Sequence, residues 1–195
     1  MSVTQLLEKN VQASIDAQQK MLLDQDLVAE FSGAVAKVIE CYQAGGRLYI
    51  AGNGGSAADA QHLAAEFVSK LARDRDPLPA EALTVDSSII TAIGNDYGYE
   101  QVFSRQLQGK VQPNDIFLGI TTSGKSPNIL KALEQCKILK IPSIIFTGRD
   151  GGGAKNLADF SVIVPGSATS TIQELHIVLA HTLCESVENT IFSDN

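Results

Sequence analysis

Short apolar runs alternate with segments of helical spacing over most of this chain, and no other feature restricts the fold as much. Residues 116–120 and 144–146 contain no polar side chain. A strand that is apolar on both faces must be covered on both faces, which is typical of a parallel sheet. Strands that alternate with helices also indicate βαβ units. The pattern therefore predicts an α/β fold, a three-layer sandwich around a parallel five-stranded sheet of flavodoxin or Rossmann type.

The expected strands cover 47–51, 81–85, 115–120, 142–147 and 160–164. The expected helices after the first strand cover 56–73, 87–94, 99–108, 127–138, 153–158 and about 170–192. Before them, residues 3–45 contain two helical segments; Asp26 is expected to cap the second, and Gly45-Gly46 ends it. A chain of this length suits one well-buried core, so we expect one domain over 1–195 with a helical amino-terminal extension at 1–45.

The composition excludes several classes of protein. A net charge of −7 argues against non-specific binding to nucleic acid or to anionic membranes. There is no basic and apolar leader and no apolar run long enough to span a bilayer, so we expect a cytoplasmic protein. Cys41, Cys136 and Cys184 are scattered within apolar helical patterns, and we expect reduced thiols in the core or at an interface.

A glycine-rich turn, Gly52-Asn53-Gly54-Gly55-Ser56, joins the first expected strand to its helix. Glycines let the backbone come close to a bound group, and the first amides of a helix are unpaired. Together with the positive end of the helix dipole, they form an anion site, most often for phosphate. His62 and Glu66 follow on one face of this helix, four residues apart. They form a possible acid/base or metal-binding pair beside the anion site.

The loop after the third strand, Gly119-Ile120-Thr121-Thr122-Ser123-Gly124-Lys125-Ser126, matches the P-loop pattern of nucleotide triphosphatases. However, Pro127 follows directly, and no apolar strand ending in Asp occurs where a magnesium ligand is needed. The loop also carries four hydroxyl groups, more than a P-loop requires, and these suit a phosphate monoester. We favour a sugar-phosphate cradle; a P-loop triphosphatase and a plain capped turn stay as alternatives.

Two further segments carry candidate side chains. Asn95-Asp96 occupies a polar break between expected helices, where it forms either an Asx-type turn or a contact to sugar hydroxyls. In the last helix, Gln173 and His181 lie two turns apart and within about a quarter-turn of each other. His176 points elsewhere, and we interpret it as a structural or interface histidine.

Four motifs resemble, in order, those of the phosphoheptose isomerases, the sedoheptulose 7-phosphate isomerases of the SIS (sugar isomerase) fold. They are Ala51-Gly52-Asn53-Gly54-Gly55-Ser56-Ala57-Ala58-Asp59-Ala60-Gln61-His62 with Glu66, Thr91-Ala92-Ile93-Gly94-Asn95-Asp96-Tyr97-Gly98, Thr121-Thr122-Ser123-Gly124-Lys125-Ser126, and Ile172-Gln173-Glu174 with His181. The likeness extends over essentially the whole chain.

The resemblance implies conversion of sedoheptulose 7-phosphate to D-glycero-D-manno-heptose 7-phosphate through an enediol, for lipopolysaccharide or other surface glycans. It implies that Glu66 is the general base and His181 the general acid. It also implies a homotetramer with active sites shared between subunits, where Glu66 and His181 can meet across an interface. Some members bind zinc, at positions that match His62, Glu66, Gln173 and His181; no nucleotide cofactor is implied. The expected substrate contacts are Asn53, Gly54, Gly55, Ser56, Glu66, Asn95, Asp96, Thr121, Thr122, Ser123, Ser126 and Gln173.

Four positions depart from the family pattern. Lys70 stands where relatives usually have Arg, and Thr171 stands where Arg often precedes Ile-Gln-Glu. Lys125 replaces a common Asn and Thr121 a common Ser, so the charge near the phosphate is redistributed. The alternative within the fold is a non-catalytic SIS adaptor similar to the replication-initiator-associating protein. Such adaptors lack the catalytic Glu and His, which this chain has as Glu66 and His181.

Overall fold

The computed structural model describes residues 1–193, so the last two residues of the expected domain lie outside the described part. Five strands, β1 (Leu48–Gly52), β2 (Ala80–Ala82), β3 (Ile116–Ile120), β4 (Ser143–Gly148) and β5 (Phe160–Val164), form one sheet in the order β2-β1-β3-β4-β5. Every neighbouring pair is parallel. The predicted parallel α/β sheet is thereby confirmed, although β2 is shorter than expected.

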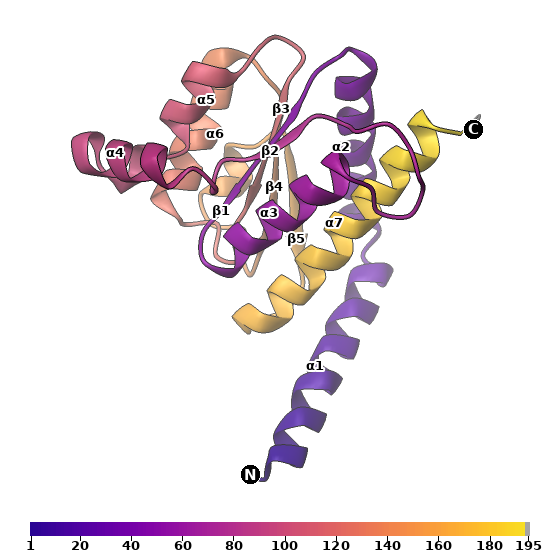
Figure 1. Ribbon diagram of the computed structural model, residues 1–195. Helices are drawn as coiled ribbons and strands as arrows, with labels where there is room; N and C mark the ends of the chain where they lie inside the picture. The colour runs from indigo at the N-terminus through magenta and orange to yellow at the C-terminus, as the bar shows by residue number, and fades with distance from the viewer. Residues whose placement is uncertain (194–195) are drawn as a thin grey trace.

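Helices cover both faces of this sheet (Figure 1). The helices α2 (Gln25–Gln43), α3 (Gly55–Val68) and α7 (Thr169–Ile191) lie on one face. On the other face are α5 (Ser104–Lys110) and α6 (Pro127–Leu139), with α4 (Ser87–Tyr97) further out. The first helix, α1 (Val3–Leu23), extends away from the sheet, while short 3₁₀ turns η1 (Tyr99–Gln101) and η2 (Ala154–Asn156) lie in the connections.

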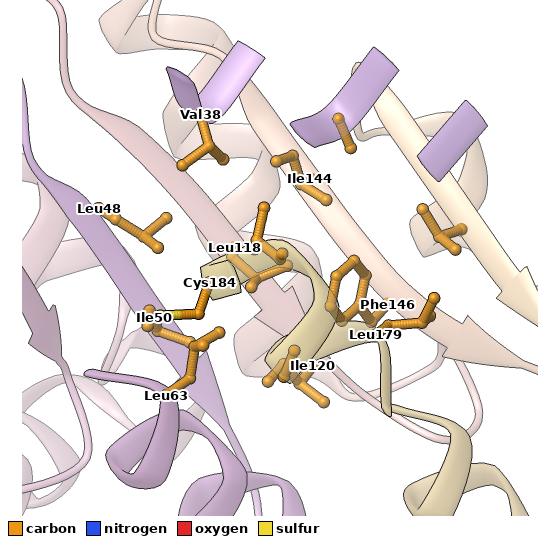
Figure 2. Packing of buried hydrophobic residues seen from close by; sticks show 14 of the residues in the cluster. Val38, Leu48, Ile50, Leu63, Leu118, Ile120, Ile144, Phe146, Leu179 and Cys184 are labelled. Atoms are coloured by element: carbon orange, nitrogen blue, oxygen red, sulfur yellow. The ribbon is translucent and has the colours of Figure 1, made fainter. Parts of the chain in front are cut away.

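The strands carry core residues on both faces because successive side chains point to opposite sides. Ile50, Leu118 and Phe146 face α2, α3 and α7, and Figure 2 shows them packed with Val38 and Leu179 of those helices. The alternate residues pack on the opposite face against α5 and α6, and they include Tyr49, Phe117 and Ile145. Burial on both faces explains why the strand sequences are continuously apolar.

Several element ends differ from the predictions. Asp24, not Asp26, caps α2: its carboxylate accepts a hydrogen bond from the Leu27 amide at 3.0 Å, while Asp26 lies inside the first turn. The helix predicted over 56–73 ends at Val68. The helix predicted over 87–94 continues to Tyr97. The segment 99–108 divides into η1 and α5.

The three cysteines agree with the expectation of reduced thiols in the core. Cys41, Cys136 and Cys184 are free and buried, and burial raises the pKa of the Cys136 thiol to about 12. These thiols are therefore protonated packing groups rather than nucleophiles. Within residues 1–193, no helix combines the length and the apolar character that crossing a membrane requires.

Candidate active site

The site begins where the strand order changes direction. From β1 the chain goes outward to β2 on one side, and it then returns to form β3 on the other side of β1. Gly52, the last residue of β1, pairs with Ile120, the last residue of β3. The glycine-rich turn and the hydroxyl-rich loop therefore start side by side at the carboxyl edge of the sheet, where ligands bind in open α/β folds.

A partly buried amide pair holds the two loops together. The Asn53 and Asn128 side chains donate to each other's oxygens, both at 2.9 Å, and the Tyr99 hydroxyl donates to Asn53 Oδ1 at 3.3 Å. An open cleft of about 450 Å³ borders them, lined by Asn53, Tyr99, Glu100, Ser126, Pro127 and Asn128. The sequence analysis did not identify Asn128 or Tyr99. For Asn128, the only signal was a polar residue at the second position of the helix that follows a candidate phosphate loop.

The hydroxyl-rich loop is braced from within and from outside. Thr121 is buried and its hydroxyl lies 3.2 Å from that of Ser126, while Ser123 Oγ accepts the Lys125 amide at 3.2 Å. Gly124 has φ of +64°, and a Cβ there would lie 2.0 Å from the Gly151 carbonyl oxygen. Only glycine allows this close approach between the loops after β3 and β4.

Lys125 does not face the loop's interior as a P-loop lysine does. Its ammonium is exposed and lies 3.8 Å from a carboxylate oxygen of Asp150. The hydrogen bond from the Gly152 amide, together with this ammonium, lowers the pKa of Asp150. Lys125 therefore pairs with a carboxylate at the surface rather than with groups inside the loop.

His62, Glu66 and His181 form a cluster within one chain. Figure 1 shows α3 and α7 side by side, running in the same direction. His62 Nε2 lies 3.0 Å from Glu66 Oε1 and 3.3 Å from His181 Nε2. The side chains of His62 and Glu66 are 47% and 21% exposed, so a small molecule can reach them. The meeting of Glu66 and His181 needs no partner subunit.

The donor set of this cluster fits a zinc ion. One donor atom from each of His62, Glu66 and His181 lies within 4.8 Å of the others. Two imidazole nitrogens that bind one tetrahedral zinc ion, at about 2.0–2.1 Å each, lie about 3.3 Å apart. The two histidine nitrogens, 3.3 Å apart, already have this separation.

Gln173 lies at the other end of the α3–α7 contact. A Cβ on Gly55 would lie 2.2 Å from Gln173 Nε2, so the absence of a side chain at Gly55 makes room for this amide. Gln173 precedes His181 by eight residues, which is about 12 Å of helix rise. Within residues 1–193, no hydrogen bond joins Gln173 to the histidine–glutamate cluster.

Asn95 and Asp96 are not brought to the cluster in this chain. They lie on the exposed last turn of α4, and the Asn95 amide donates to Asp96 Oδ1 at 2.8 Å.

In the glycine-rich turn after β1, Gly54 and Gly55 are exposed, and Ser56 is buried beneath them. Asp59, one turn before His62, has one buried carboxylate oxygen, and burial raises the pKa of this carboxyl group.

Comparison with known proteins places the chain in one family. The family model of the SIS domain matches residues 12–148. Phosphoheptose isomerase of Aneurinibacillus thermoaerophilus is 50% identical over 186 residues, covering 95% of this chain and 94% of the relative. Phosphoheptose isomerase 2 of Campylobacter jejuni is 49% identical, covering 92% and 89% of the two chains.

The solved structures agree with the sequences. Phosphoheptose isomerase from Francisella tularensis has a TM-score of 0.92 at 34% identity, covering 97% of this chain and all of that one. The enzyme from Neisseria gonorrhoeae has a TM-score of 0.90 at 37% identity, covering 96% of this chain and all of its own. The chain therefore belongs to the SIS domain family and, within it, to the phosphoheptose isomerases, which are sugar-phosphate isomerases.

Proposed function

We propose that the chain converts sedoheptulose 7-phosphate to D-glycero-D-manno-heptose 7-phosphate through an enediol. Glu66 removes a proton from C1 of the ketose and returns it to C2. His181 donates a proton to the carbonyl oxygen at C2 and accepts one from the hydroxyl at C1. A carboxylate and an imidazole suit this exchange because both are common general acids and bases in enzymes.

The observation that carries the proposal is the short distance between the groups of α3 and α7. Glu66 and His181 both adjoin the His62 ring, with contacts of 3.0 and 3.3 Å, although 115 residues separate Glu66 from His181 in the sequence. Seven residues of α3 separate Gly55 from His62, which is about 10 Å along the helix axis. An extended seven-carbon sugar can therefore place its phosphate by the turn and the hydroxyl loop and its carbonyl end by the cluster.

At the phosphate end, we assign the contacts to Thr121, Thr122, Ser123 and Ser126, with Ser56 and the backbone of Gly54 and Gly55. Asn53 binds a sugar hydroxyl from its place in the amide pair with Asn128. We keep Asn95 and Asp96 as sugar contacts by resemblance. In one chain these two side chains bond to each other on exposed α4, so they would act at the site of a neighbouring subunit.

Zinc, when bound, would polarise the substrate carbonyl as a Lewis acid. His62, Glu66 and His181 would hold it, because their donor atoms are already gathered. Gln173 remains a fourth candidate by resemblance, and its long side chain would have to turn from Gly55 toward the cluster. Calorimetric titration with zinc tests the assignment: we expect binding by the unmodified protein and its loss in His62→Gln.

The activity is tested by incubating the protein with sedoheptulose 7-phosphate, with and without zinc, and following formation of the aldose. Glu66→Gln and His181→Gln are each expected to abolish turnover while the circular dichroism spectrum stays unchanged. Glu174→Gln is the matched control, because Glu174 is exposed on α7, the helix that carries His181, and is assigned no role. Turnover at the unmodified rate in Glu66→Gln or His181→Gln would reject the assigned roles.

We further propose a homotetramer that works in the cytoplasm and supplies heptose for surface glycans, as the family resemblance implies. Support for assembly comes from α1, where Val3, Leu7, Val11 and Ile15 share one face and are all exposed. An exposed apolar stripe of this kind marks an association surface. Light scattering should give the tetramer mass for the unmodified protein and a smaller mass for Leu7→Glu. Unchanged mass in the variant would exclude this stripe from the interface.

A further inference from the structure

A buried ion pair lies directly behind the cluster, and the reaction described above does not use it. Arg75 follows α3 in the connection to β2, and Glu188 lies near the end of α7. Their side chains are 2% and 1% exposed, and Arg75 Nη2 lies 2.8 Å from Glu188 Oε1. Among the ion pairs of residues 1–193, the others all have side chains at least 21% exposed.

The guanidinium of Arg75 caps the turn of α3 that carries Glu66. Its Nη2 donates to the Glu66 carbonyl at 2.9 Å, and its Nη1 donates to the Phe67 carbonyl at 2.7 Å. The last carbonyls of a helix have no partner within the helix, and a cation is favourable at that end of the dipole. Arg75 therefore determines where this last turn ends and how it is oriented.

Glu188 holds the guanidinium in place from α7. Its Oε1 accepts from Arg75 Nε at 2.9 Å and from the Leu71 amide at 3.0 Å, and its Oε2 accepts from the Ala72 amide at 3.2 Å. Burial alone would raise the pKa of Glu188, but these amides and the guanidinium lower it. The carboxylate is thus ionised and has donors on both oxygens.

The spacing along α7 connects this pair to the cluster. Glu188 follows His181 by seven residues, which is two helical turns, so both side chains leave the same face toward α3. His181 contacts His62 directly. Two helical turns further along α7, Glu188 binds Arg75, which in turn binds the Glu66 carbonyl group. The two helices are therefore held together on both sides of the Glu66 side chain.

We propose that Arg75, held by Glu188, is a positioning residue that sets the separation of the Glu66 carboxylate from the His181 imidazole. The inference rests on the roles proposed above for these two groups. A displacement of about 1 Å at reacting groups can lower a rate about 100-fold. The phosphate contacts lie at the other end of α3, so loss of Arg75 should affect turnover rather than substrate binding.

The test compares Arg75→Lys with Arg73→Lys by steady-state kinetics with sedoheptulose 7-phosphate. Lysine keeps the charge but lacks the fork that reaches two carbonyls and a carboxylate. We expect kcat of Arg75→Lys to fall on the order of 10- to 100-fold with KM nearly unchanged. Arg73 is the matched control, because it is exposed two residues away, and its substitution should change neither constant. Glu188→Gln should resemble Arg75→Lys.

A merely structural role would lower the melting temperature and leave kcat per folded enzyme unchanged, and that result would overturn the proposal. A raised KM with unchanged kcat would overturn it as well. If the single variants do not fold, the double variant Arg75→Met with Glu188→Leu is used, since apolar replacement of a whole buried pair is usually tolerated. Unmodified kcat in the folded double variant would equally exclude positioning.

Glu66→Gln, measured in the same series, separates the two proposals. If Glu66→Gln is inactive while Arg75→Lys keeps the unmodified kcat, only the positioning role fails. If Glu66→Gln retains turnover, the proposed role of Glu66 as the base is wrong.

Discussion

His176 gives a quantitative prediction about pH and stability. This histidine is 1% exposed on α7, and its ring lies 6.3 Å from that of Phe146. Neither ring nitrogen makes a hydrogen bond of ordinary geometry with residues 1–193. Burial lowers the pKa of His176 from 6.5 to about 4, because a charged imidazolium is poorly stabilised in the apolar core.

The sign of the effect follows from proton binding. Between pH values of 6.5 and about 4, the unfolded chain binds a proton at His176 that the native protein does not bind. The stabilisation is therefore complete above the unfolded value and is lost as the pH falls toward the folded value. At about pH 5, roughly 1.5 units below the unfolded pKa, the native protein loses about 2 kcal/mol of unfolding free energy relative to neutral pH.

The assay is urea unfolding at about pH 7 and about pH 5, at one protein concentration and with a chelator present so that metal binding does not contribute. His176→Leu removes the titrating group and keeps an apolar side chain of similar size. We expect the unfolding free energy of the variant to fall by about 2 kcal/mol less than that of the unmodified protein between the two pH values. Equal falls in both proteins would refute the reasoning, because all other titrating groups are shared.

Two further predictions concern the turn after β1. In Gly55→Ala, the new Cβ would lie 2.2 Å from Gln173 Nε2, so the amide must leave Gly55. Because Gln173 needs the same movement before it can bind zinc, we expect tighter zinc binding in a calorimetric titration, and unchanged affinity would remove Gln173 from the ligand set. In Asn128→Asp, the buried donor to Asn53 is lost, which should lower the unfolding free energy in urea by about 1–3 kcal/mol. The same variant should raise KM for sedoheptulose 7-phosphate because the turn is released, whereas an unchanged KM would show that Asn53 is held without Asn128.

The sheet could be predicted from the sequence because its strands are apolar on both faces. The expected strand at 160–164 coincides with β5, and those at 47–51 and 142–147 differ from β1 and β4 by one residue at each end. Helix ends were less accurate, since they depend on contacts made elsewhere. The helix expected to reach residue 73 ends at Val68, where Arg75 binds its carbonyl groups, and no local pattern indicates that contact.

The candidate site, like the fold, could be predicted only in part from the sequence. His62 and Glu66 were predictable as a pair from their helical spacing, and the hydroxyl loop from its position after an apolar strand. The hydrogen bonds of Asn53 to Asn128 and of Arg75 to Glu188 join residues 75 and 113 positions apart. Such pairings become visible only when the topology places β1 beside β3 and α3 beside α7.

The position of His181 on the last helix has a consequence for synthesis of the protein. A chain emerging from the ribosome completes α3 and the five strands before α7, the last helix, is made. Until α7 docks, His62 and Glu66 lack their third partner, and the apolar face beneath Leu179 is open to solvent. If His181 has the proposed role, we expect nascent chains to be inactive, and their open apolar face favours aggregation until translation is nearly finished.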